Sequence, residues 1–160
     1  MRLFIGLPVP NAISDELVEL QNSLPQHARK VPKENFHVTL VFLGECARDR
    51  LENLRRVKSK PFFVTTTRTG AFTHAAWLGI EPSPDLQALH KSLVDATSPR
   101  DAPARFVPHI TLGRTRTRIS GWSGKRFVRT WLASTFVLYE SLSTPSGVRY
   151  RKLEIFSMEK

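Results

Sequence analysis

Cysteine and long apolar runs are scarce in this sequence. The single cysteine, Cys46, excludes an internal disulfide and is typical of a reducing compartment, so we expect a cytoplasmic location. No apolar run reaches the length that spans a bilayer. Pro8 and Pro10 interrupt the short apolar N-terminus, which therefore reads as a strand rather than a signal peptide. A membrane partner is not expected.

Sequence motifs for metal ligation are also missing. The chain has no H-E-x-x-H motif and no cysteine cluster, and no pair of carboxylates stands near the histidine motifs described below. We therefore expect neither a metal nor another cofactor.

Acidic residues are few. The chain has 14 Asp and Glu against 24 Lys and Arg, which gives a net charge of +10. The excess is concentrated between Arg100 and Arg129, where Asp101 is the only acid. A basic field of this kind attracts polyanions, of which nucleic acid is the commonest. The alternative is a basic surface that only keeps the protein in solution. Binding of a polyanion is favoured because three arginines follow closely after the second histidine motif described below: Arg114, Arg116 and Arg118.

The length of 160 residues suits one domain, here residues 1–160, or two small lobes that share a core. Hydrophobic patterns and turn residues predict strands and helices in mixed order. The strands are expected at 2–7, 36–44, 62–68, 75–80, 106–113, 131–139 and 148–158, and the helices at 11–24, 47–57 and 84–97. This order predicts an α+β fold with mostly antiparallel sheet and two similar lobes.

The strand expected at 36–44 carries the first motif. Alternation places Phe36, Val38, Leu40 and Phe42 on one face, and His37, Thr39, Val41 and Leu43 on the other. A histidine and a threonine therefore stand side by side on one face of a strand. One such pair is more often structural than functional.

The same motif occurs a second time. His109 and Thr111 repeat the spacing of His37 and Thr39, and both copies read His-x-Thr-Leu. The chain has only five histidines, so two matches are informative. We interpret the two strands as two halves of one site.

Paired imidazoles and hydroxyls suit in-line displacement at phosphorus. One imidazole takes a proton from the attacking oxygen and the other gives a proton to the leaving oxygen, and the ordinary histidine pKa of about 6.5 suits both roles. Threonine hydroxyls can donate to non-bridging phosphate oxygens. Arg114 can supply a positive charge where no metal does. A 2′,3′-cyclic phosphate is a fitting substrate, with a bell-shaped pH–rate profile around neutrality.

The residues also carry a resemblance to a known family. The opening Arg2-Leu3-Phe4-Ile5, the run from Asn35 to Glu45, and Pro108-His109-Ile110-Thr111-Leu112 with Arg114 resemble the two-histidine (2H) phosphoesterases, in particular the RNA 2′,3′-cyclic phosphodiesterase branch, also called 2′-5′ RNA ligase. The segments Phe136–Ser141 and Tyr150–Phe156 are similar too. The resemblance implies a bilobal fold with two pseudosymmetric lobes, outer helices and a central groove.

The resemblance also implies the activity. It implies metal-independent hydrolysis of 2′,3′-cyclic phosphate ends of RNA to 2′-phosphates, which can reverse as 2′-5′ ligation. By analogy His37 is the general acid and His109 the general base, with Thr39 and Thr111 beside them. Arg114, Arg116, Arg118, Phe4 and Tyr139 are candidates for binding phosphate or RNA, although core packing is also open for both aromatic residues.

Two other functions stay open. The same chemistry could serve small cyclic nucleotides or 2′-5′-linked oligonucleotides, or the chain could be a non-catalytic basic RNA-binding module. We expect a monomer, because no apolar interface stripe is evident. Gly6 and Gly113 stand where larger residues are expected, and neither is expected to touch the catalytic set. His27, His74 and His90 are interpreted as ordinary surface or core histidines.

Overall fold

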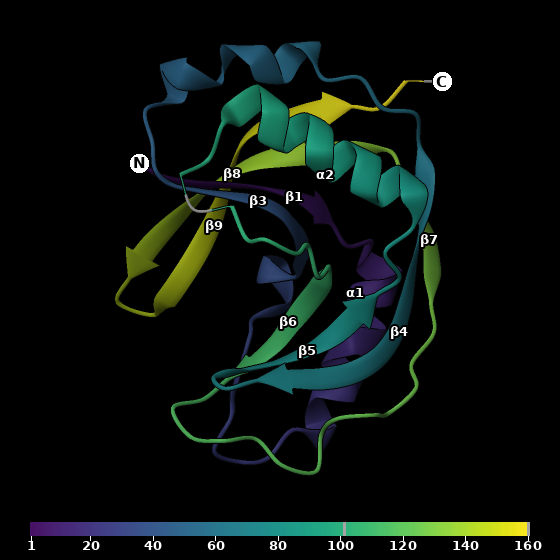
Figure 1. Cartoon of the computed structure of the whole chain (residues 1–160). Helices are drawn as coiled ribbons and strands as arrows, with labels where there is room; N and C mark the ends of the chain where they lie inside the picture. The colour runs from purple at the N-terminus through teal and green to yellow at the C-terminus, as the bar shows by residue number, and fades with distance from the viewer. Residues whose placement is uncertain (101, 160) are drawn as a thin grey trace.

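The computed structural model describes residues 1–100 and 102–159 (Figure 1). The strands are β1 (Arg2–Pro8), β2 (Arg29–Lys30), β3 (His37–Glu45), β4 (Phe62–Phe72), β5 (Ala75–Ile80), β6 (His109–Arg114), β7 (Thr130–Ala133), β8 (Thr135–Thr144) and β9 (Gly147–Ser157). The α-helices are α1 (Asn11–Leu20) and α2 (Pro84–Thr97). The described residues also contain three 3₁₀ segments, which in chain order are η1 (Gln21–Ser23), η2 (Lys33–Asn35) and η3 (Arg48–Arg56).

The strands form one antiparallel path in the order β7-β4-β5-β6-β3-β1-β8-β9, with β2 added beside β6. We call β3, β1, β8 and β9 the first half-sheet, and β7, β4, β5 and β6 the second half-sheet. The halves join where Val38 of β3 pairs with Ile110 of β6, and both of these side chains are fully buried. The two motif strands therefore meet at the centre of the molecule.

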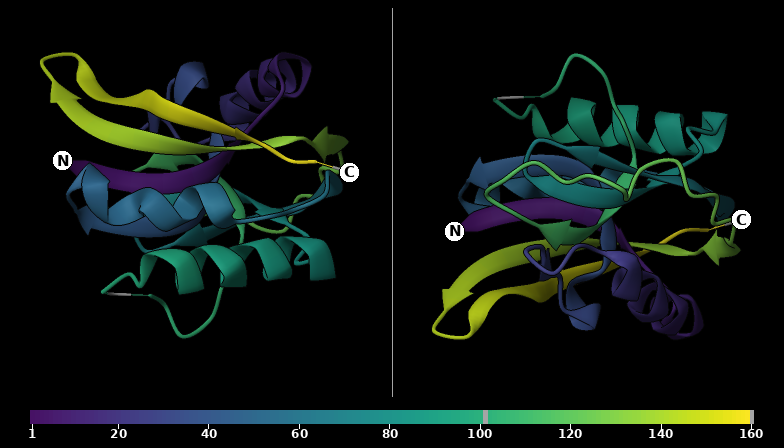
Figure 2. Two further views of the ribbon diagram at one scale, coloured as in Figure 1. Left: turned by 90° about the horizontal axis from the view of Figure 1, so that it is seen from above. Right: turned by 90° about the horizontal axis from the view of Figure 1, so that it is seen from below.

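Each helix lies on the half-sheet that does not contain the strand before it. Helix α2 follows β5 but packs beside η3 and β3, where it buries Leu86, Leu89 and Leu93 (Figures 1 and 2). Helix α1 follows β1, and the chain just after it reaches β6, where Leu24 contacts Gly113. Ser83 caps α2 by accepting a hydrogen bond from the Leu86 N–H, and Pro84 occupies its first turn. The connections thus cross between the halves.

The α+β fold with mostly antiparallel sheet is confirmed, but several elements differ from the prediction. The helix expected at 11–24 ends as an α-helix at Leu20, and the strand expected at 62–68 continues to Phe72. The helix expected at 47–57 is the 3₁₀ segment η3, with non-helical angles at Leu51. The strand expected at 131–139 divides at Ser134 into β7, which pairs with β4, and β8, which pairs with β1 and β9. The strand expected at 106–113 begins at His109. A run of apolar residues cannot reveal that a chain changes neighbours within it.

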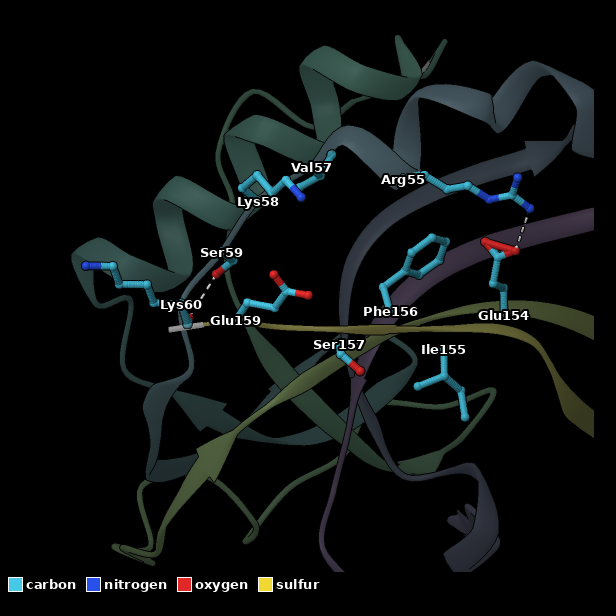
Figure 3. Close-up of a pocket in the computed structure, with 10 residues that line it drawn as sticks. All are labelled: Arg55, Val57, Lys58, Ser59, Lys60, Glu154, Ile155, Phe156, Ser157 and Glu159. Atoms are coloured by element: carbon cyan, nitrogen blue, oxygen red, sulfur yellow. Dashed lines mark hydrogen bonds and ion pairs between the residues drawn. The ribbon is translucent and has the colours of Figure 1, made fainter.

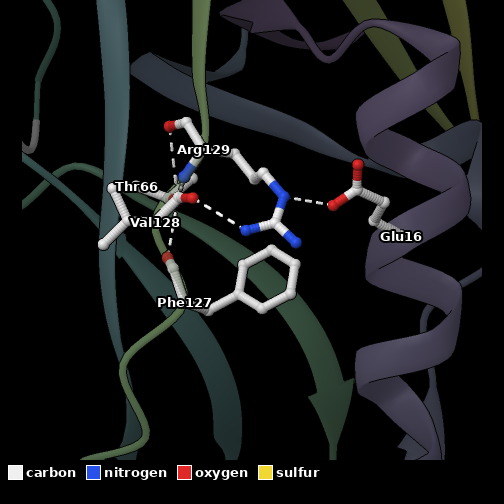
Figure 4. A network of polar contacts seen from close by, with 5 residues as sticks. All are labelled: Glu16, Thr66, Phe127, Val128 and Arg129. Carbon is white, nitrogen blue, oxygen red and sulfur yellow. Dashed lines mark hydrogen bonds and ion pairs between the residues drawn. The ribbon is translucent and has the colours of Figure 1, made fainter.

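The basic segment between β6 and β7 is fastened to the second half-sheet (Figure 4). The Thr66 hydroxyl donates to the Phe127 carbonyl at 2.7 Å and accepts from the Arg129 N–H at 2.7 Å. The Arg129 guanidinium pairs with Glu16 of α1 and lies 4.4 Å from the centre of the Phe127 ring. Part of the basic stretch therefore has a structural role, while Arg116 and Arg118 remain exposed.

No helix within residues 1–100 and 102–159 is long and apolar enough to cross a membrane.

Candidate active site

The two His-x-Thr-Leu motifs occupy matching places in the fold. From His37 to Phe42 and from His109 to Arg114, half-buried, buried and exposed residues follow one another in the same order. In an antiparallel register centred on Val38 and Ile110, His37 lies across from Thr111, and Thr39 lies across from His109. The pairing thus brings the two motifs together, as the sequence predicts.

A β-bulge follows each motif threonine. In the β1–β3 register, Ile5 pairs with Val41 and Gly6 with Thr39, so Leu40 is the extra residue. In the β5–β6 register, Ala76 pairs with Gly113 and Trp77 with Thr111, so Leu112 is the extra residue. Each leucine of His-x-Thr-Leu is therefore the bulged residue of its strand.

The bulge makes the predicted alternation wrong beyond Leu40. Val41 is buried in the core and not on the histidine face. Phe42 is 68% exposed and its ring lies 6.1 Å from Phe4, which itself contacts His37. The extra residue shifts the side-chain phase by one position, so Phe42 moves to the face of His37 and Thr39.

Each imidazole is anchored through Nδ1 to the carbonyl two residues before it. His37 Nδ1 donates to the Asn35 carbonyl at 2.8 Å, and His109 Nδ1 donates to the Val107 carbonyl at 2.7 Å. Because a carbonyl can only accept, the proton of each neutral ring lies on Nδ1. Nε2 of each ring is therefore free to accept or, when protonated, to donate a proton.

Nε2 of His37 lies 2.8 Å from Oγ1 of Thr39. In the neutral ring the hydroxyl donates to Nε2, and after protonation the direction reverses. Thr39 therefore holds the reactive nitrogen toward the site in either state. Thr111 of β6 is half-buried, and its register partner on the neighbouring strand β5 is Trp77.

Aromatic rings enclose both histidines in a similar way. Tyr150 of β9 meets the His37 ring edge-on at 5.2 Å between centroids and 89°. Phe72 of β4 meets the His109 ring edge-on at 5.3 Å and 89°. Each imidazole thus has a rigid apolar wall supplied by a strand other than its own.

Phe4 and Tyr139 are buried parts of this enclosure. They stack on one another at 4.9 Å between centroids, and Phe4 lies 4.8 Å from the His37 ring. Only 3% of Phe4 and 5% of Tyr139 is exposed, so neither presents a free face to an RNA base. In this structure both rings pack in a small buried cluster with Val137.

Gly6 touches the catalytic set, contrary to the sequence expectation. A Cβ at Gly6 would lie 2.9 Å from the Val38 carbonyl oxygen and 3.3 Å from Cδ2 of His37. At Gly113 the nearest atom to a Cβ would be Cδ1 of Leu24, at 2.9 Å. Both positions exclude side chains because another part of the structure fills the space.

Electrostatics around the two rings favour their neutral forms. Burial lowers the pKa of His37 to about 4, with smaller contributions from the nearby His109 and Arg114, while the hydrogen bond to Asn35 opposes the shift. Burial also lowers the pKa of His109, again with a contribution from Arg114. Arg114 therefore lies close enough to act on both rings, and the structure gives no such link for Arg116 or Arg118.

A cavity of about 240 Å³ adjoins the paired motifs. Thr39 and Phe42 line it from β3, and Phe72, Val107 and His109 line it from the second half-sheet and its loop. Phe42 is 68% exposed and Phe72 is 47% exposed, so both rings are accessible to solvent beside the cavity. Neither phenylalanine belongs to a motif that marks it as a site residue in the sequence.

A second, larger hollow lies away from the motifs. It has a volume of about 750 Å³ between η3 and the end of β9 (Figure 3). Its lining residues are Arg55, Val57, Lys58, Ser59, Lys60, Glu154, Ile155, Phe156, Ser157 and Glu159. Glu154 is already paired with Arg55 at 3.1 Å, and no motif residue belongs to this hollow. We therefore place the candidate site at the smaller cavity.

Metal ligands do not gather in the part of the chain that the structure describes. There, no group of three or more His, Cys, Asp or Glu side chains could hold a metal ion. The groups that do converge are two imidazoles, two threonines and one guanidinium. Such a set can bind a phosphate and move protons on both sides of it.

Known proteins are similar to this chain in sequence and in fold. A sequence profile described as the 2′-5′ RNA ligase superfamily matches residues 9–136. The RNA 2′,3′-cyclic phosphodiesterase of Archaeoglobus fulgidus is 28% identical, over 98% of this chain and 99% of its own length. That of Thermotoga maritima is 29% identical, over 96% and 93%. The apo structure of Escherichia coli LigT superposes with a TM-score of 0.88 at 26% identity, covering 99% of this chain and 98% of LigT.

The profile spans most of the chain, and the relatives match it almost from end to end. The two anchored histidines lie at the centre of the fold that these proteins share. The chain therefore belongs to the 2′-5′ RNA ligase superfamily.

Proposed function

We propose that this chain is an RNA 2′,3′-cyclic phosphodiesterase that opens the ring to a 2′-phosphate. The observation that carries the proposal is the matched pair of imidazoles, each held through Nδ1 by a backbone carbonyl with Nε2 available. Curated relatives that cover the chain almost completely bear this name, which supports the substrate class. Binding alone would not require two imidazoles held in the same way.

Hydrolysis requires one proton to leave the nucleophile and one to reach the leaving group. In the proposed reaction, His109 Nε2 accepts a proton from water as the water oxygen attacks phosphorus. The bond from phosphorus to the 3′ oxygen breaks, and His37 Nε2 gives its proton to that oxygen. The phosphate remains on the 2′ oxygen, and both imidazoles then exchange protons with solvent. When the 5′ hydroxyl of another RNA attacks phosphorus in place of water, the same proton transfers break the bond to the 3′ oxygen and join the two RNAs through a 2′-5′ bond.

The charge of the substrate makes this cycle feasible. In the free protein a pKa of about 4 leaves His37 neutral at pH 7. A bound phosphate anion favours the protonated ring, because an opposite charge within a few ångströms raises a histidine pKa. His37 then holds a proton that it releases readily. Arg114 and the hydroxyls of Thr39 and Thr111 are proposed to hold the non-bridging oxygens.

We further propose that the protein acts as a monomer in the cytoplasm, without a metal, on polymeric RNA. The single cysteine supports the location, and the net charge of +10 supports a polymer over a mononucleotide. Arg116 and Arg118 are exposed and lie two and four residues after Arg114. They are proposed to contact the RNA backbone.

The decisive experiment is single-turnover hydrolysis of a short RNA that ends in a 2′,3′-cyclic phosphate, with EDTA present. We expect the wild type to yield a 2′-phosphate, and His37→Gln and His109→Gln each to lose at least about 10²-fold in rate. His27→Gln, at an exposed histidine, is the matched control. Loss of activity in EDTA that a divalent cation restores would contradict the metal-free reaction.

Two results would redirect the proposal. Salt-dependent RNA binding without turnover in the wild type would support a non-catalytic RNA-binding module. Faster turnover of cyclic mononucleotides than of the RNA would support the small-molecule alternative.

A further inference from the structure

The buried amide of Gln21 connects the chain after α1 to both motifs. Only 3% of Gln21 is exposed. Its Nε2 donates to the carbonyl of Leu112 at 2.9 Å and to the carbonyl of Val31 at 2.8 Å. Leu112 is the bulged residue of the second motif. Val31 belongs to the segment that runs through η2 into His37.

His90 of α2 makes the corresponding connection from the other side. Its Nδ1 donates to the carbonyl of Leu40 at 2.8 Å, and Leu40 is the bulged residue of the first motif. Its ring stacks on Phe106 at 4.0 Å between centroids and 2° between planes. Phe106 precedes Val107, whose carbonyl anchors His109.

Each of the two side chains therefore links the bulge of one motif to the segment that leads into the other motif. Gln21 links the bulge after Thr111 to the approach to His37. His90 links the bulge after Thr39 to the approach to His109. Neither side chain comes from a motif strand, and the helices that carry them lie on opposite half-sheets.

We propose that Gln21 and His90 are positioning residues that hold the two motif strands in catalytic register. The inference rests on the proposed function and deepens it, because the distance between the imidazoles has to match the span of an in-line reaction. The motif strands share the pair Val38 and Ile110 at their junction. Two crossed links, one on each side of that pair, restrain the strands from sliding or opening around it.

The reaction is sensitive to such restraint. A displacement of about 1 Å at a catalytic group can cost on the order of 10²-fold in rate. A β-bulge lacks the regular ladder of hydrogen bonds and is a flexible point unless its carbonyl finds another donor. His90 supplies such a donor to Leu40. The Leu112 carbonyl accepts from the Val31 N–H at 3.0 Å, and Gln21 adds a second donor that ties Leu112 and Val31 together through one amide.

Three variants separate the contacts. Gln21→Met keeps the length of the side chain without a donor, His90→Phe keeps the aromatic stack without a donor, and His90→Asn keeps a donor without the stack. Gln87→Met and His27→Phe are matched controls at exposed positions. Kinetics are measured on the cyclic phosphate RNA well below each unfolding midpoint, and near-ultraviolet circular dichroism confirms the native fold.

We expect Gln21→Met and His90→Phe to lower kcat about tenfold or more while KM stays within about twofold. His90→Asn should recover a large part of the loss, which a merely space-filling role would not allow. If kcat in both donor-deleted variants matches that of the controls, the inference is overturned. An inactive wild type would instead overturn the proposed function.

A measurement on the wild type avoids any dependence on variants that fold poorly. The side-chain amide protons of Gln21 should exchange with solvent far more slowly than those of exposed Gln87, and the NMR signals of His90 should report an Nδ1-protonated ring. Exchange at Gln21 as fast as at Gln87, or an Nε2-protonated ring at His90, would also overturn the inference.

Discussion

Phe42 and Arg114 occupy equivalent positions in the two motif strands, each five residues after its histidine and two residues after a bulged leucine. Both side chains are exposed at this point of the burial pattern. One half of the site therefore presents an aromatic ring and the other half a guanidinium. The backbone is pseudosymmetric, but the ligand-binding chemistry is not, and this difference can fix the direction in which a nucleotide binds.

The aromatic side predicts a role in binding the terminal nucleoside. Phe42→Ala should raise KM by roughly tenfold with a smaller change in kcat, because stacking of a base on an aromatic ring contributes about 1–3 kcal/mol. Phe63→Ala is the control, since Phe63 is similarly exposed at 66% and lies on β4 outside the cavity. Steady-state kinetics on the cyclic phosphate RNA test this, and equal KM values in the two variants would contradict it.

The cationic side predicts an effect on both imidazoles. Arg114→Gln should raise the pKa of His37 and of His109 in the free protein, because the guanidinium lowers both. The same change should reduce kcat/KM by roughly 10- to 100-fold, since a charge-assisted hydrogen bond to phosphate contributes about 1.5–3 kcal/mol. NMR titration of the imidazole protons and kinetics provide the two measurements. Arg116→Gln should leave both pKa values unchanged, and a shift there would argue against a specific role for Arg114.

The lowered pKa values predict an acidic optimum for kcat/KM. This parameter reports the free enzyme, in which the base has to be neutral and the acid protonated. Both imidazole pKa values lie below the ordinary value of about 6.5, so at neutral pH the free enzyme has lost the proton that the acid needs. We therefore expect kcat/KM to fall as pH rises through neutrality. At saturating substrate, the bound phosphate anion should move the kcat profile to higher pH. A kcat/KM optimum above pH 8 would show that other groups titrate.

The roles of the two histidines predict that variants of His37 and His109 differ in their activity on a substrate whose leaving group needs little protonation. Replacing the 3′ oxygen of the cyclic phosphate by sulfur gives a leaving group that needs little protonation. The variant that lacks the acid should regain much of its activity on this substrate, and the variant that lacks the base should not. We expect recovery in His37→Gln, and recovery in His109→Gln instead would exchange the two roles.

Gly6 and Gly113 predict different costs for the same substitution. A Cβ at Gly6 meets a backbone oxygen of β3 at 2.9 Å, whereas at Gly113 it meets the end of the Leu24 side chain, which can rotate away. Gly6→Ala should therefore lower the unfolding free energy by about 1–3 kcal/mol and reduce kcat, because Val38 and His37 have to move. Gly113→Ala should have the smaller effect on both. Denaturant unfolding and kinetics test this, and equal losses would contradict it.

The motif residues and the fold class could be predicted from sequence because they follow from repeated local patterns. The pairing of His37 with Thr39, and of His109 with Thr111, needs only the two-residue period of a strand. The bulges at Leu40 and Leu112 could not be predicted, because a bulge is defined by the register of a neighbouring strand that lies far away in sequence. Without that register, simple alternation places Phe42 on the wrong face of β3.

Long-range contacts explain the other omissions. His90 has no sequence neighbour that marks it, and its two partners, Leu40 and Phe106, lie 50 residues before it and 16 after it. Phe4 and Tyr139 read equally well as core or as ligand-binding residues until their stacking on one another is known. A sequence lists the chemical groups, but burial decides which of their faces remain available.

The order of strands has a consequence for synthesis of the protein. β1 lies between β3 and β8, so the earliest of these strands to be synthesised pairs with a strand whose residues follow about 130 positions later. Tyr150, which closes the wall beside His37, follows later still. A nascent chain can thus form both motif strands and yet lack an enclosed His37 until β8 and β9 emerge. The wall beside His37 is therefore completed only after both motif strands have been synthesised.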